Sequence, residues 1–249
     1  MCVRPARSRR GQVPLAFVLT LALAGLAGQR ALRGVLPPLA PAPAAARSSL
    51  AQSAWQRTNP GGGGAFNAIG GGPSGILLAA SDLSGAYRSL DGGHTWEVIG
   101  AFHGLTSTHV SGLGFDPLDP TLLYLGTEEG IFRSDDGGEN FRFVLNHGYI
   151  TDIAIAPSNP RVGYAAHHSQ YNVADGAVYK TTDRGRTWAR VSGASLPNGL
   201  HILKLLVSPQ DEDVLYALAG EGRFACGPAV LYESVDGGRT WARLAANLG

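Results

Sequence analysis

The sequence predicts an all-β fold made of repeated four-stranded antiparallel units, the architecture of a β-propeller. Three observations support this. One eight-residue phrase occurs four times, short apolar strands flank each copy, and no segment after residue 54 has helical periodicity. The phrases are SLDGGHTW (Ser89–Trp96), SDDGGENF (Ser134–Phe141), TTDRGRTW (Thr181–Trp188) and SVDGGRTW (Ser234–Trp241). Their aspartates are 45, 47 and 53 residues apart, which is the length of one propeller blade.

Each phrase is expected to form the turn between the third and fourth strands of a blade. An aspartate can accept hydrogen bonds from backbone N–H groups just ahead of it, and glycine adopts positive φ without steric cost. The closing aromatic ring can bury a large apolar surface beside the hairpin. Four identical aspartates at four blade corners cannot converge on one substrate, so the sequence assigns them a structural role. The residues with this role are Asp91, Trp96, Asp136, Phe141, Asp183, Trp188, Asp236 and Trp241.

Two further strands precede each hairpin. In the second unit, a strand at 110–115 and an apolar strand at 122–126 flank the Pro/Asp-rich turn 116–120. The blades are expected at 65–100, 108–147, 149–194 and 201–245.

The segment WQRT at 55–58 resembles a fourth strand but has no blade of its own. It favours an incomplete seven-bladed propeller, with the remaining blades beyond Gly249. The alternative is that Trp55 belongs to a loose N-terminal arm.

Residues 1–54 differ in character from the propeller region at 55–249. They contain seven arginines, no Asp or Glu, a 16-residue apolar run from Val13 to Gly28, and then Ala/Pro-rich sequence. A basic start followed by a short apolar run is typical of a secretory signal, so we expect an exported protein. An uncleaved membrane anchor with a Pro/Ala linker is the alternative.

Composition excludes several classes of function. Without the leader, 13 Lys and Arg face 19 Asp and Glu, so no basic surface for nucleic acid is expected. Cys2 lies in the leader and Cys226 then has no partner, which rules out a disulfide framework. No His-x-x-x-His spacing occurs, and we expect neither a metal nor a cofactor.

The blade topology sorts the loops onto two faces. The aspartate turns share one face with the turns between strands one and two. The opposite face collects histidines, carboxylates and aromatic rings, including Glu128 and His201. Such a mixture suits a sugar site, although polar residues are also common in any loop. The residues predicted to bind substrate are His103, His109, Tyr149, His167, His168, Tyr171, Glu221 and Arg223.

The repeated phrase resembles the Asp-box, or BNR repeat, of sialidases, sortilin-type receptor domains and family 74 glycoside hydrolases. The motif is specific for the propeller but not for a function. A second resemblance is narrower. The stretches WQRTNPGGGGA (55–65) and ASDLSGAYR (80–88) resemble the opening of family 74 enzymes, with Ser84 in place of an expected glycine.

The resemblance to family 74 implies an inverting endo-glucanase with two propellers facing across a cleft. It implies that Asp82 is the catalytic base and that the acid lies on a second propeller outside this chain. The expected substrate is a β-glucan such as xyloglucan. The alternative is a non-catalytic propeller that binds protein or carbohydrate, as sortilin-type domains and assembly factors do. An arginine triad and the N-terminal motif of sialidases are not recognisable, so a sialidase is disfavoured.

Overall fold

The computed structural model describes residues 63–168, 176–193, 196, 200–221 and 229–246. The leader predicted at 1–54, the strand predicted at Trp55, and two predicted site residues, Tyr171 and Arg223, lie outside this range. Within it, no helix is long and apolar enough to cross a membrane.

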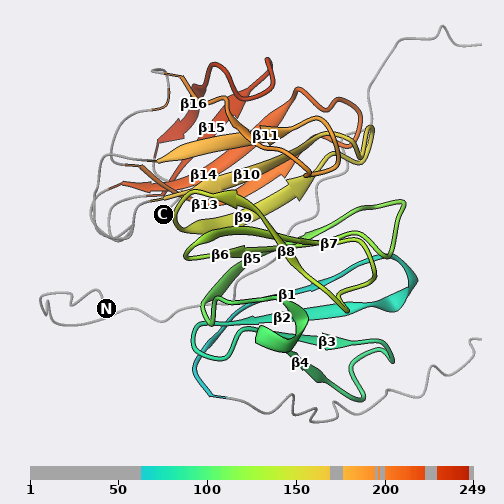
Figure 1. Ribbon diagram of the computed structural model, residues 1–249. Helices are drawn as coiled ribbons and strands as arrows, with labels where there is room; N and C mark the ends of the chain where they lie inside the picture. Colours follow the sequence, from blue (N-terminus) through green and yellow to red (C-terminus); the bar gives the residue numbers. More distant parts are fainter. Residues whose placement is uncertain (1–62, 169–175, 194–195, 197–199, 222–228, 247–249) are drawn as a thin grey trace, which may run out of the picture. The chain divides into compact units, whose positions relative to one another are not determined.

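The described residues form four antiparallel sheets of four strands each, in which the strands pair in chain order (Figure 1). The prediction of propeller blades is confirmed. Blade 1 contains β1 (Phe66–Gly71), β2 (Leu77–Ser81), β3 (Ala86–Ser89) and β4 (Glu97–Ile99). Blade 2 contains β5 (Val110–Phe115), β6 (Leu123–Thr127), β7 (Gly130–Ser134) and β8 (Arg142–Asn146). Blade 3 contains β9 (Ile150–Ile155), β10 (Gly163–His167), β11 (Ala177–Thr181) and β12 (Ala189–Arg190). Blade 4 contains β13 (Leu200–Val207), β14 (Leu215–Glu221), β15 (Ala229–Ser234) and β16 (Ala242–Ala246).

Successive blades pack face to face through apolar side chains. Separate clusters of buried residues lie between blades 1 and 2, blades 2 and 3, and blades 3 and 4. The first strand of each blade contacts the first strand of the next, β1 to β5, β5 to β9 and β9 to β13. Strands β6, β7 and β10 are buried along their whole length, as expected for strands that are covered on both faces.

The four repeated phrases form four turns of the same construction, here called the aspartate turns. In blade 1, Asp91 accepts hydrogen bonds from the hydroxyl of Thr95 at 2.6 Å and from its backbone N–H at 2.9 Å. The hydroxyl of Ser89 donates to Asp91 and accepts from the N–H of Gly93, both at 2.8 Å. In blade 2 the side-chain amide of Asn140 replaces the threonine hydroxyl. Each carboxylate is therefore used within its own turn.

A basic residue on the third strand of a blade reaches the aspartate turn of the next. Arg88 Nη1 donates to the carbonyl of Gly137 at 2.8 Å, and Arg133 Nε donates to the carbonyl of Arg184 at 2.7 Å. In blade 3, Lys180 instead pairs at 2.7 Å with Asp213, which lies in the turn between β13 and β14 of blade 4, beside the aspartate turn. These contacts fix the register between blades.

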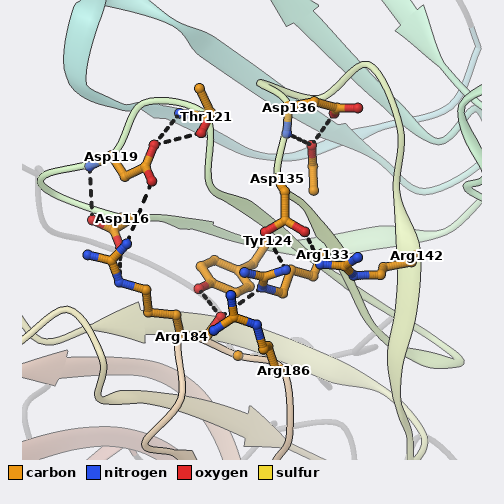
Figure 2. A network of polar contacts seen from close by, with 12 residues as sticks. Asp116, Asp119, Thr121, Tyr124, Arg133, Asp135, Asp136, Arg142, Arg184 and Arg186 are labelled. Atoms are coloured by element: carbon orange, nitrogen blue, oxygen red, sulfur yellow. Dashed lines mark hydrogen bonds and ion pairs between the residues drawn. The ribbon is translucent and has the colours of Figure 1, made fainter.

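Arg184 has an unusual conformation within this network. Its φ is +60°, at a turn position where the other blades have Gly92, Gly137 and Gly237. Figure 2 shows its guanidinium directed toward two carboxylates of blade 2: Nε lies 3.8 Å from Asp116 Oδ2 and Nη1 lies 3.7 Å from Asp119 Oδ2. A non-glycine residue in this conformation costs roughly 1 kcal/mol, and the attraction between Arg184 and the fully buried Asp116 acts in the opposite direction.

Candidate functional site

One backbone position recurs on the side of the blades opposite the aspartate turns. The residue after the second strand donates its N–H to the carbonyl of the residue before the first strand. The pairs are Asp82 to Ala65 (3.1 Å), Glu128 to His109 (3.3 Å) and His168 to Tyr149 (3.1 Å). We call these six residues the rim. Since the first strands contact one another from blade to blade, the rim residues lie along the same inner side of the blades.

The carboxylate of Asp82 is fixed by its own blade. Oδ1 accepts the backbone N–H of Ala65 at 2.7 Å, while Oδ2 has no hydrogen-bond partner in the described part of the chain. Gly64, with φ of +89°, lies against Oδ1, so a larger residue there would collide with the carboxylate. One oxygen is thus held and the other is available to a ligand or water.

Ser84 forms hydrogen bonds that hold the Asp82 loop in place. Its hydroxyl donates to the carbonyl of Gly63 at 2.9 Å and accepts from the hydroxyl of Tyr87 at 2.9 Å. The glycine expected here from the resemblance could make neither bond. The serine therefore anchors Gly63, which precedes the glycine beneath Asp82.

A row of aromatic rings runs from the rim of blade 2 through the rim of blade 3 to His201 in β13 of blade 4. His109 Nε2 lies 2.6 Å from the hydroxyl of Tyr149, and the ring of Tyr149 stacks on His168 at 4.8 Å. His168 in turn meets His201 edge to face at 4.8 Å. Burial raises the pKa of Tyr149, and the negative charges of Glu128 and Asp82 raise it further. The row therefore lies on the same side of the blades as the two rim carboxylates.

Two of the histidines predicted to bind substrate have other surroundings. His167 is only 4% exposed and packs against His147 and Tyr179. Its ring is therefore buried between these two side chains and does not lie at the surface.

His103, which is also predicted to bind substrate, is not one of the rings in this row. It ends the short 3-10 turn η2 (Ala101–His103), and its Nε2 lies 3.4 Å from Glu97. Its carbonyl accepts the N–H of Phe141, at the end of the second aspartate turn. The chain doubles back here because Gly104 adopts a left-handed conformation (φ +77°).

The remaining predicted residues are placed only in part. Glu221 is the last residue of β14, opposite Leu200. Glu128 lies on the face predicted to bind sugar, and it is the blade 2 counterpart of Asp82. Comparing the residues that follow each second strand, Asp82, Glu128 and His168, would have found it from sequence. Across the described residues, no group of three or more His, Cys, Asp or Glu could hold a metal ion.

Comparison with known proteins gives matches of two kinds. The family model "Sortilin, neurotensin receptor 3" matches residues 129–249. A xyloglucanase of a Paenibacillus species is 27% identical over 192 residues, covering 69% of this chain and 17% of its own length. A xyloglucanase of Acetivibrio thermocellus is 26% identical over 150 residues, covering 53% of this chain and 17% of its own length. The chain thus spans about a sixth of these relatives.

The crystal structure of an ancestral GH74 enzyme superposes with a TM-score of 0.62 and 24% identity. It covers 77% of this chain, and the chain covers 25% of it. This likeness confirms the propeller fold. Together with the xyloglucanase sequences, it supports the description of the chain as a glycoside hydrolase-like propeller.

Proposed function

We propose that this chain is part of an exported glycoside hydrolase that cleaves a β-glucan such as xyloglucan with inversion. The observation that carries the proposal is the rim carboxylate of Asp82, held at Oδ1 by Ala65 on the same inner side of the blades as the aromatic row. The two xyloglucanases that share sequence with the chain support the choice of substrate class. Export is inferred from the predicted leader and from the resemblance to such enzymes.

In the proposed mechanism, Asp82 acts as general base. Oδ2 accepts a proton from water as that water attacks the anomeric carbon, while Oδ1 stays bonded to the backbone. An acid on the far side of the sugar donates a proton to the leaving oxygen. Inverting enzymes hold the two carboxyl groups about 6.5–9.5 Å apart so that the water fits between them. The acid is proposed to lie on a second propeller of the same protein.

The aromatic row is proposed to hold the glucan. The face of Tyr149 is occupied by His168, so the sugar would meet ring edges and the polar atoms of His109 and Tyr149. Their hydrogen bonds would be made to sugar hydroxyls, while the nearby carboxylates of Asp82 and Glu128 accept further hydroxyl protons.

The test is hydrolysis of xyloglucan by a protein that joins this chain to a propeller supplying the acid. Asp82→Asn should lower kcat by about 10³-fold, the usual contribution of a general base, with little change in substrate affinity. Glu129→Gln, an exposed change on the same face, serves as the control and should retain activity. Unchanged turnover in Asp82→Asn would remove this residue from the mechanism.

A non-catalytic binding propeller is the second candidate, and the match of residues 129–249 to the sortilin family model favours it. The two candidates differ in what Asp82→Asn does. For a binding propeller, wild type and variant would release no reducing ends, and Tyr149→Ala would still weaken binding of a glucan oligosaccharide or of a protein ligand measured by calorimetry.

A further inference from the structure

The loop that contains Asp82 presents an apolar side chain to solvent. Leu83, the next residue, is 67% exposed. Its backbone is held in place by Ser81, whose hydroxyl accepts the N–H groups of Leu83 and Ser84, both at 3.3 Å. The Ser81 hydroxyl also donates to the carbonyl of Gly63 at 3.1 Å. Leu83 is therefore carried by a turn that is fixed by hydrogen bonds on both sides.

The corresponding turn of blade 2 has a charged residue at this position. Thr127 takes the place of Ser81, and its hydroxyl accepts the N–H groups of Glu129 and Gly130, both at 3.2 Å. Glu129, the counterpart of Leu83, is also exposed. The same turn thus forms with a charged side chain or with an apolar one, so its conformation does not require a leucine.

Single exposed apolar residues are common on proteins, and what distinguishes Leu83 is its place beside the rim. A Cβ added at Gly64 would meet both Asp82 Oδ1 and, at 2.9 Å, the Cβ of Leu83. The carboxylate and the leucine side chain therefore lie against the same glycine. Gly64 and Ala65 are exposed and Asp82 is half-buried, so the surface around Leu83 is accessible within the described part of the chain.

An apolar group beside a carboxylate matches the two kinds of surface on a neutral sugar. The edge of a pyranose ring carries hydroxyls, which bind to carboxylates and imidazoles, and its faces carry C–H groups, which favour an apolar contact. The aromatic row offers polar atoms and ring edges, because Tyr149 stacks on His168. Leu83 adds an apolar surface next to Asp82.

We propose that Leu83 is a substrate-binding residue that packs against the C–H face of the glucan unit next to Asp82. The inference rests on the proposed function in one respect, namely that the Asp82 loop borders the glucan site. Leu83 contributes to affinity and not to the chemical step, because its side chain has no group that can exchange a proton. It would contact the sugar equally in the ground state and in the transition state, and so would lower KM without changing kcat.

Calorimetric titration of the full chain with the xyloglucan heptasaccharide measures this contact directly. Leu83→Asn replaces the apolar surface by a polar one and should raise Kd about tenfold, the effect of losing the burial of one leucine side chain. Leu83→Met keeps an apolar side chain of similar volume and should bind within about twofold of wild type. Leu118→Asn is the matched control: Leu118 is 73% exposed in the turn between β5 and β6, on the aspartate-turn face, and its replacement should leave Kd unchanged.

Circular dichroism checks that each variant is folded. The Leu83 variants should retain the native spectrum, because the side chain is exposed and blade 2 forms the same turn with Glu129.

The outcomes for Leu83 and for the proposed function can be told apart. In the protein joined to a propeller that supplies the acid, Leu83→Asn should raise KM about tenfold and leave kcat within about twofold, whereas Asp82→Asn lowers kcat. A tenfold loss of affinity in a protein that hydrolyses no xyloglucan would support the Leu83 contact and refute the enzymatic function. An unchanged Kd in Leu83→Asn, or an equal loss in Leu118→Asn, would overturn the Leu83 proposal even if hydrolysis depends on Asp82. A wild-type chain that binds no heptasaccharide would overturn it as well.

Discussion

The aspartate turns and the rim lie at opposite ends of the same strands, and the chain treats them differently. At the turns, the same aspartate recurs in all four blades and its bonds stay within one loop. At the rim, one backbone position holds Asp82, Glu128 and His168 in successive blades, and the ring of His168 meets His201 of the next blade. In this chain, repetition of a residue accompanies a structural role. At the candidate site, by contrast, the residue at the repeated rim position differs from blade to blade.

The largest stability difference between the two ends should come from removing an aspartate of a turn. Asp136→Ala deletes the acceptor for Ser134 and for two donors of Asn140, and should lower the free energy of unfolding by about 2 kcal/mol. Glu128→Gln at the rim, where no side-chain hydrogen bond is lost, should change it by less than about 0.5 kcal/mol. Urea unfolding followed by tryptophan fluorescence measures both. Equal losses would show that the rim is as structural as the turns.

A smaller effect is expected where the rim does contain a hydrogen bond. Tyr149→Phe removes the hydroxyl that lies 2.6 Å from His109 and should cost about 1 kcal/mol in the same assay. Thr151→Val, which removes a hydroxyl donated to the carbonyl of Ile202, is a control for loss of a side-chain hydrogen bond between blades. If Tyr149→Phe left glucan binding unchanged, the aromatic row would belong with the turns as a structural element.

The smallest expected effect is the stability that the Asp236 turn loses at low pH. The hydroxyl and backbone N–H of Thr240 lower the pKa of Asp236 to about 2, against about 3.9 in an unfolded chain. Because the folded pKa is depressed, this stabilisation is complete above about pH 4 and is lost as the pH falls toward 2. Asp236→Asn should lower the Tm by less than about 2 °C at pH 6, since the turn is exposed, and the difference should vanish near pH 2. Thermal melts at both pH values measure it, and a gap that persisted in acid would contradict the assigned cause.

The fold was predictable from the sequence because the repeated eight-residue phrase marks one hairpin in every blade. Asp91 and its three counterparts mark the hairpins, and the apolar runs mark the strands, so the blades could be placed without coordinates. The placement of His103 was not predictable, because a single left-handed residue, Gly104, sends the connection back along its own blade. The burial of His167 beside the accessible side of His168 likewise depends on where β10 ends, which periodicity leaves uncertain by a residue.

The rim site was predictable only in outline. Loop assignment brings Asp82, His109 and Tyr149 to one face, but the hydrogen bond between His109 and Tyr149 joins residues 40 positions apart. Such a contact depends on the rotation between neighbouring blades, which no local pattern encodes. Ser84 is similar: as a replacement for glycine it looks neutral in the sequence, and only the coordinates show that it binds Gly63.

The left-handed conformation of Arg184 has a consequence for how such a chain can change over time. The three glycines at the equivalent turns adopt this conformation without strain, whereas Arg184 has its guanidinium near Asp116 and Asp119 of the preceding blade. If blade 3 were duplicated or transplanted elsewhere in the series, it would carry the strained backbone without the anions that compensate it. The four units share one pattern but are therefore not interchangeable. The side-chain contacts between blade 3 and blade 2 favour the order in which these units occur along the chain.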